Sequence, residues 1–138
     1  MPPHPDKPAP LQLLTVLLLH DAPAGAHYDW MVCDPRAPGD PLAKLWTVRV
    51  AAPSSEWAKL GVWDAQPLPF HRRDYLQYEG PLSGNRGGVT RVDEGWAAAR
   101  LFSRKRIEWE VSMRHFTGRL EMTLEAAARW RVRVFGGG

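Results

Sequence analysis

The chain has 138 residues, of which 44% are hydrophobic, 24% are charged and seven are tryptophan. This length and composition exclude a disordered chain and favour one folded domain with its own core. The longest apolar run, Leu13 to Leu19, is far shorter than the ~20 residues of a membrane-spanning helix, and the N-terminus lacks the pattern of a secretory signal. We therefore expect a cytoplasmic protein without membrane contact, and the single cysteine, Cys33, fits a reducing compartment.

Proline and glycine mark the two ends of the sequence. Five of the first ten residues are proline, which lacks the backbone donor that helices and sheets use. We expect residues 1–10 to be a disordered lead-in, residues 11–135 to be the folded domain, and residues 136–138 to be a glycine tail.

Short apolar segments separated by turn residues fill the rest of the chain. The run from Leu11 to His20 could form a buried strand or a short buried helix, and the segments that follow it favour the strand. Residues 106–113, RIEWEVSM, alternate Ile107, Trp109 and Val111 with polar residues, as a half-buried strand does. Further strands are predicted over residues 27–32, 45–51, 88–93, 96–102, 119–123 and 129–135.

Only two segments have a helical pattern, Pro53–Leu60 and Leu124–Ala128, and both are short. Seven or eight short strands would expose many sheet edges unless the sheet closes. The sequence therefore predicts a mostly β fold, a small antiparallel barrel that is closed or nearly closed, with one or two short helices. A β-sandwich is the alternative architecture.

A group of possible metal ligands comes from the first two predicted strands. His27 and Asp29 are two residues apart, so both side chains point to the same face of a strand. His20 ends the preceding strand, and the short Pro- and Gly-containing segment between them would bring it alongside. Two imidazoles and one carboxylate leave open positions on a cation for water and substrate. Without other evidence, partnered histidines at strand ends would be the commoner interpretation.

A second group of residues lies in the segment from His71 to Gly80, HRRDYLQYEG. The spacing of His71 and Tyr75 places both on one face of either an extended or a helical segment. An imidazole and a phenol can donate hydrogen bonds to a phosphoryl oxygen, and the imidazole can also transfer a proton. Packing aromatics beside solvated arginines would give the same pattern.

Together, the two groups resemble the 3′-phosphoesterase domain of bacterial DNA ligase D. The similarity runs from about His20 to Gly95 and includes His20, the His-Tyr-Asp motif at His27, Lys44-Leu45-Trp46 in place of the family's Leu-x-Trp strand, and the His71–Gly80 segment with the Gly-rich turn after it. The resemblance implies a small β-barrel that uses Mn²⁺, or another divalent cation, to trim 3′ ends of nucleic acid during DNA repair. It implies that His20, His27 and Asp29 bind the metal and that His71 and Tyr75 are catalytic.

The sequence departs from the family pattern at two positions. The first two histidines of the family are usually six residues apart, whereas His20 and His27 are seven apart, so the turn needs a bulge or another donor replaces one of them. Met31 stands where the family commonly has an arginine two residues after the metal-binding aspartate. Because methionine offers no charge or donor, we expect Arg86, in the turn SGNRGG, to bind phosphate instead.

The basic residues are concentrated in the last third of the chain. Lys and Arg outnumber Asp and Glu by nine to four over residues 97–138, and such a surface suits contact with nucleic acid phosphates, although solvated basic faces are common. The expected partners are 3′ ends of DNA or RNA and a repair ligase or polymerase. The residues predicted to hold the backbone are Arg104, Lys105, Arg106 and Arg114.

Two other functions fit parts of the pattern. His27, Asp29 and His71 could form the facial triad of a non-haem iron oxygenase, although His20 and Tyr75 would then have no role. Alternatively, the domain binds nucleic acid ends without turnover, having lost the arginine at position 31. Release of phosphate in the presence of manganese would distinguish the phosphoesterase from the oxygenase and from the domain that only binds.

Overall fold

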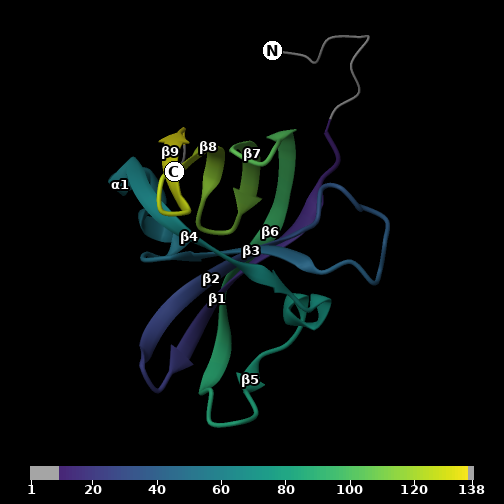
Figure 1. Ribbon diagram of the computed structural model, residues 1–138, viewed down its shortest axis with the longest axis vertical. Helices are drawn as coiled ribbons and strands as arrows, with labels where there is room; N and C mark the ends of the chain where they lie inside the picture. The colour runs from purple at the N-terminus through teal and green to yellow at the C-terminus, as the bar shows by residue number, and fades with distance from the viewer. Residues whose placement is uncertain (1–9, 137–138) are drawn as a thin grey trace.

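The computed structural model describes residues 10–136, which form one nine-stranded antiparallel sheet with short helical segments (Figure 1). The predicted lead-in and glycine tail lie almost wholly outside this range. The elements are β1 (Leu13–Ala22), β2 (Gly25–Cys33), β3 (Leu45–Val50), the 3₁₀ helix η1 (Ser54–Glu56), α1 (Trp57–Leu60), β4 (Val62–His71), the 3₁₀ helix η2 (Arg73–Leu76), β5 (Gly80–Pro81), β6 (Gly88–Phe102), β7 (Arg106–Met113), β8 (Thr117–Glu125) and β9 (Arg129–Phe135).

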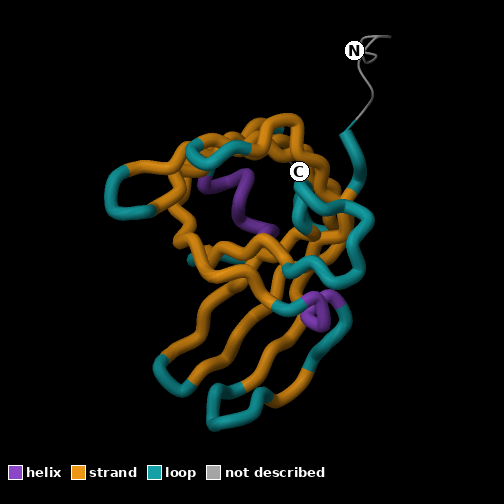
Figure 2. Tube along the Cα trace, turned by 45° about the vertical axis from the view of Figure 1, so that its right-hand side comes forward, coloured by secondary structure: helices purple, strands orange, loops and turns teal. Residues whose placement is uncertain are grey.

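The sheet closes into the predicted barrel of eight strands. The strand order is β1-β2-β3-β4-β9-β8-β7-β6-β5, and β1 also pairs with β6, which completes the ring. The first half of β6 pairs with β1 and with the two-residue strand β5, whereas its second half pairs with β7. The β1–β2 hairpin and the start of β6 therefore extend beyond the ring, as the lower part of Figure 2 shows.

Tryptophan side chains fill the interior of the barrel. Trp30 is fully buried and packs edge to face against Trp46, Trp57 and Trp109, with ring centroids 5.3–5.8 Å apart. The alternation predicted for residues 106–113 is confirmed, because Ile107, Trp109 and Val111 are all buried. Since alternate residues of a strand face opposite sides, the residues on either side of Trp30 in β2 point out of the barrel.

A buried threonine satisfies the indole of Trp30, and its loss should destabilise the fold. Trp30 Nε1 donates to Thr15 Oγ1 at 2.8 Å, and this hydroxyl donates to the Met31 carbonyl at 2.7 Å. Replacing Thr15 with valine keeps the shape but leaves the buried indole N–H of Trp30 without its partner. We expect Thr15→Val to lower the free energy of unfolding by about 1–3 kcal/mol, measured by urea denaturation. Thr123→Val, at an exposed position of β8, is the control and should change it by less than about 0.5 kcal/mol.

Two sequence predictions need correction, and one strand was not predicted. Leu124–Ala128 is not helical: it ends β8 and forms the turn to β9, in which Ala127 and Ala128 have φ values of 69° and 52°. The two strands predicted over residues 88–93 and 96–102 are one strand, because Asp93–Gly95 remain paired with β1. Finally, β4 was not predicted, since Pro67 and Pro69 argue against a strand. Both prolines lie beyond the part of β4 that pairs with β9, where only β3 is a neighbour.

Membrane-spanning helices are absent from residues 10–136, where none of the helices has the necessary length and apolar character.

Candidate metal centre

The β1–β2 hairpin brings the three predicted metal ligands together. His20 and His27 are directly opposite each other in the register, and a two-residue turn separates Ala22 from Gly25. The seven-residue spacing therefore needs neither a bulge nor another donor. Asp29 follows two residues after His27 and lies on the same face, which is the outer face of the barrel wall because Trp30 points inward.

The geometry of this group suits a cation. One ligand atom from each of His20, His27 and Asp29 lies within 4.8 Å of the others, so the group could hold a metal ion. His27 Nδ1 is 2.9 Å from Asp29 Oδ1, and His20 Nδ1 is 3.9 Å from Asp29 Oδ2. Donors on opposite sides of one cation are about 4.3 Å apart, given bonds of about 2.0–2.2 Å, so small side-chain rotations would close the group. Two imidazoles and a carboxylate fit several first-row divalent metals.

The surroundings favour the neutral, metal-binding form of His27. Burial lowers the pKa of His27, and the positive charge of Arg49 lowers it further, whereas the neighbouring Asp29 carboxylate opposes both effects. A histidine must be neutral to bind a metal. The lowered pKa therefore extends the range in which His27 can act as a ligand toward more acidic pH.

Arg49 is a feature of this site that the sequence analysis missed. It lies on β3 directly opposite Asp29 and therefore shares the outer face with the three ligands. Its Nε is buried without a hydrogen-bond partner, and its guanidinium forms no ion pair with any residue in 10–136. Trp63, Arg91 and Trp109 also have an unpartnered buried nitrogen, but of these four residues only Arg49 pairs directly with a member of the metal-ligand group, where a water or an anion could satisfy it. The available signal was a cation within the otherwise uncharged strand LWTVRV.

A cavity of about 280 Å³ opens beside Arg49. Its polar lining includes His27, Gln66 and Arg129, and Asp64 completes the polar set. Arg129 is partly neutralised by Asp64, whose Oδ2 lies 3.5 Å from its Nε. Of the two arginine side chains that line this cavity, Arg49 is thus the one that remains available to bind an anion.

Met31 and His71 lie on the same outer face of the barrel, farther along the strands from the metal-ligand group. Met31 lies two residues beyond Asp29 and is buried, so no charge occupies the family's arginine position. His71 on β4 pairs with Leu45 on β3, and Leu45 pairs with Cys33 on β2. His71 is therefore in line with Cys33, four residues beyond Asp29. This corresponds to about 13 Å along the strand. The donor group within 4.8 Å contains His20 and not His71, so the facial triad considered above is not assembled.

His71 and Tyr75 lie next to each other, as predicted, with ring centroids 5.8 Å apart. Among the described residues, no hydrogen bond or aromatic contact joins either of them to the metal-ligand group; His71 Nδ1 instead lies 2.7 Å from the Pro69 carbonyl. Tyr75 lines a cavity of about 370 Å³ together with Arg72, Tyr78 and Arg86. The link to the metal-ligand group is through Arg86, whose backbone carbonyl is 2.7 Å from His20 Nε2.

The guanidinium of Arg86 is occupied within its own turn. Its Nε donates to the Ser83 carbonyl at 2.8 Å, and its Nη2 donates to Ser83 Oγ at 3.1 Å. Arg86 therefore lies beside the site as predicted, but its side chain already has partners. Of the two arginines next to the metal-ligand group, Arg49 is the better placed to bind an anion.

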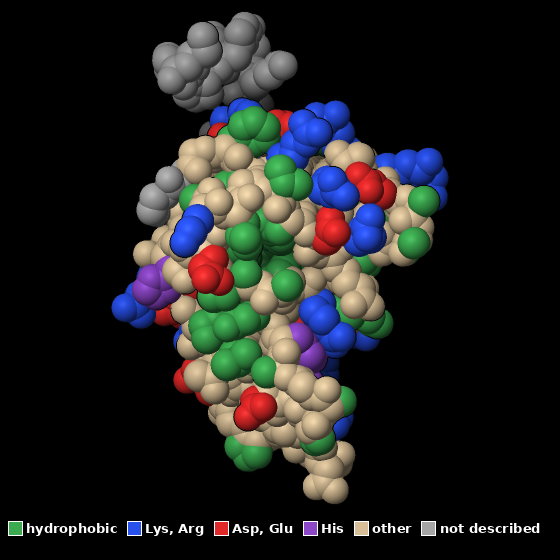
Figure 3. Space-filling model, turned by 90° about the vertical axis from the view of Figure 1, so that its left-hand side faces the viewer, with side chains coloured by type: hydrophobic (Ala, Val, Ile, Leu, Met, Phe, Trp, Pro, Cys, Tyr) green, Lys and Arg blue, Asp and Glu red, His purple; other side chains and the backbone are tan. Residues whose placement is uncertain are grey.

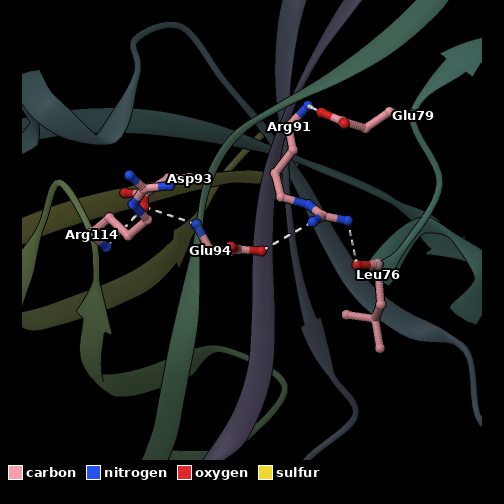
Figure 4. Close-up of polar contacts among 6 residues, drawn as sticks. All are labelled: Leu76, Glu79, Arg91, Asp93, Glu94 and Arg114. Carbon is pink, nitrogen blue, oxygen red and sulfur yellow. Dashed lines mark hydrogen bonds and ion pairs between the residues drawn. The ribbon is translucent and has the colours of Figure 1, made fainter.

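Arg91 on β6 holds the segment that carries Tyr75 against the barrel (Figure 4). Its Nη2 donates to the Leu76 carbonyl at 2.8 Å, and its backbone N–H donates to Glu79 Oε1 at 2.6 Å. Its Nη1 also contacts Glu94 Oε2 at 3.1 Å. These contacts fix both ends of residues 76–79, so Tyr75 has a defined position next to β1.

The basic residues of the last third are mostly paired with acids. Neighbouring strands provide the partners, as in Arg100–Glu110 at 2.6 Å and Arg131–Asp64 at 2.9 Å. In the upper part of Figure 3, basic and acidic side chains accordingly alternate. Arg104 and Lys105 follow the C-terminal end of β6, whereas His20 pairs with Val89 near the N-terminal end of that strand. Arg106 lies 3.8 Å from Glu121, and Arg114 is in the β7–β8 turn. None of these four residues lines the two cavities beside the metal-ligand group.

No protein-family model matches this chain, and no curated protein matches it either.

Proposed function

We propose that this protein is a metal-dependent phosphoesterase that processes 3′ ends of nucleic acid. The observation that carries the proposal is an arginine without a partner, Arg49, directly opposite Asp29 in a group of three metal-ligating side chains. Metal donors beside an available guanidinium suit a substrate that presents phosphate, because the planar guanidinium binds two phosphate oxygens at once. Within this class of enzyme, the resemblance to the DNA ligase D domain supports a 3′ end as the substrate and manganese as the metal.

Each side chain has a defined task in this proposal. His20, His27 and Asp29 would hold the cation, which when bound would supply Lewis-acid polarisation of the ester and activation of the water that replaces the leaving oxygen on phosphorus. Arg49 would bind the non-bridging oxygens and stabilise the charge that grows on them. The resemblance implies catalytic roles for His71 and Tyr75; because His71 is about 13 Å farther along the same face, these side chains would bind the nucleic acid beyond the scissile ester, and the leaving oxygen would take its proton from water. The reaction would prepare an end for a repair ligase or polymerase.

The proposal is tested by adding the purified protein to duplexes with a recessed strand ending in a 3′-phosphate or in a single 3′-ribonucleotide. With manganese, we expect release of inorganic phosphate from the first or of a nucleoside from the second. A 5′-phosphate duplex is the matched control and should remain intact. Chelation with EDTA should stop the reaction, and manganese should restore it. Lack of release from both 3′ substrates over a range of manganese concentrations would contradict the proposal.

A second candidate is a protein that binds nucleic acid ends without turnover. Met31, at the position where the family has an arginine, is the observation that favours it. Binding of the 3′-phosphate duplex, without release of phosphate, would support this candidate. Iron-dependent oxygen consumption would instead indicate the oxygenase considered above, despite the position of His71.

A further inference from the structure

The turn that connects β5 and β6, residues 82–87, contacts a metal ligand through its backbone. His20 Nε2 is 2.7 Å from the carbonyl oxygen of Arg86, although the two residues are 66 positions apart. A carbonyl oxygen only accepts hydrogen bonds, so Nε2 must carry the proton and donate it. In a neutral imidazole, the other nitrogen then has a free lone pair. That nitrogen, Nδ1, is the one 3.9 Å from Asp29 Oδ2 and directed at the cluster.

Glycine at position 87 allows this close approach. A Cβ atom at Gly87 would be 1.8 Å from the carbonyl oxygen of Asp21, the residue after His20. The turn is closed by a 2.7 Å hydrogen bond from the Leu82 N–H to the Gly87 carbonyl. Any larger residue at position 87 would therefore push the turn, and with it the Arg86 carbonyl, away from β1.

Gly84, in the same turn, provides an internal comparison. Its φ of 70° is close to the 80° of Gly87, so a side chain would strain the backbone similarly at both positions. A Cβ at Gly84, however, would meet no atom within 4 Å. Alanine would strain the backbone at both positions, but only at position 87 would it also displace the turn from His20.

We infer that Arg86 and Gly87 position the metal centre: the Arg86 carbonyl fixes the tautomer and ring orientation of His20, and Gly87 permits the contact. Hydrogen-bond partners of metal-binding histidines commonly serve this purpose, and their loss reduces metal affinity by about 10–100-fold. The inference rests on the metal site of the proposed function, but it does not depend on the reaction.

The test compares Gly87→Ala with Gly84→Ala by calorimetric titration with MnCl₂ of each full-length protein. Gly87→Ala should weaken manganese binding by about 10–100-fold, whereas Gly84→Ala should remain within about threefold of the wild type. Equal losses in the two variants would overturn the inference, because backbone strain alone would explain them. Wild-type protein that binds no manganese would overturn both the inference and the metal site. Wild-type protein that binds manganese but hydrolyses no ester would contradict only the proposed reaction.

A spectroscopic measurement on metal-free wild-type protein keeps the inference testable if Gly87→Ala does not fold. The ¹⁵N chemical shifts of the His20 ring at a pH where the ring is neutral report which nitrogen carries the proton. We expect protonated Nε2 and unprotonated Nδ1. The opposite tautomer would show that the Arg86 carbonyl does not fix this ring, and would overturn the inference.

Discussion

Asp29→Asn should reduce manganese-dependent release of phosphate by about a thousandfold. Asp29 is the only carboxylate of the ligand group and is only 4% exposed, so its loss would leave the cation with two neutral ligands. The amide has nearly the same shape but lacks the charge that holds a cation. Loss of several kcal/mol of transition-state stabilisation corresponds to about this factor, since each 1.36 kcal/mol is tenfold in rate. The measurement is kcat/KM on the 3′-phosphate duplex, together with manganese affinity.

Glu110→Gln is the matched control for this change. Glu110 lies on β7 and pairs with Arg100 on the surface at 2.6 Å. It is opposite Ala98, nine residues along β6 from Val89, the partner of His20, so the substitution removes the same charge far from the ligand group. Its kcat/KM should stay within about twofold of the wild type, because isolated surface ion pairs contribute little. Retention of wild-type kcat/KM by Asp29→Asn would eliminate the proposed metal centre.

Arg49→Met should have the second largest effect, a loss of about a hundredfold in kcat/KM with little loss of stability. A charged hydrogen-bond donor aimed at developing negative charge contributes about 10²–10³ in rate. The stability expectation follows from the buried, unpartnered Nε of Arg49: removing an unsatisfied polar atom relieves a cost. We therefore expect a melting temperature equal to or above that of the wild type. A residue that is retained at a cost to stability is typical of a binding site.

Two other substitutions make the Arg49 prediction specific. Arg119→Met on β8 removes the same charge from a surface arginine that contacts Glu121 at 3.3 Å, and should leave kcat/KM within about twofold. Arg86→Ala should cost much less than Arg49→Met, because the Arg86 guanidinium is bonded to Ser83. If Arg86→Ala were the more damaging of the two, the phosphate would be held by the turn and not by β3.

The sequence predicted that His20, His27 and Asp29 form a group able to hold a metal ion, because their proximity depends only on local geometry. His20, His27 and Asp29 belong to one hairpin, in which alternation and a short turn determine which side chains meet. The barrel was predictable for a related reason, since many short strands with turns between them leave few other architectures.

Arg49 could not be placed opposite Asp29 because their pairing depends on the register between β2 and β3. The intervening residues 34–44 contain several turns, and their length does not determine which residues pair. Local propensity was also misleading at Leu124–Ala128, where a helix-favouring alanine run forms the turn of a hairpin whose strands pair as far as Glu125 and Arg129. Tertiary pairing outweighed the preference of the segment.

The candidate metal donors all fall within residues 20–29, whereas Arg49 and the Arg86 carbonyl come from distant segments. A ten-residue stretch with two imidazoles and a carboxylate can chelate a cation before the chain has folded, and binding to the denatured state subtracts from the stabilisation that a ligand gives to the native state. Manganese should therefore protect this protein against heat less than its native-state affinity suggests. Phosphate, whose binding needs β2 and β3 in register, should transfer its binding free energy to thermal protection almost in full.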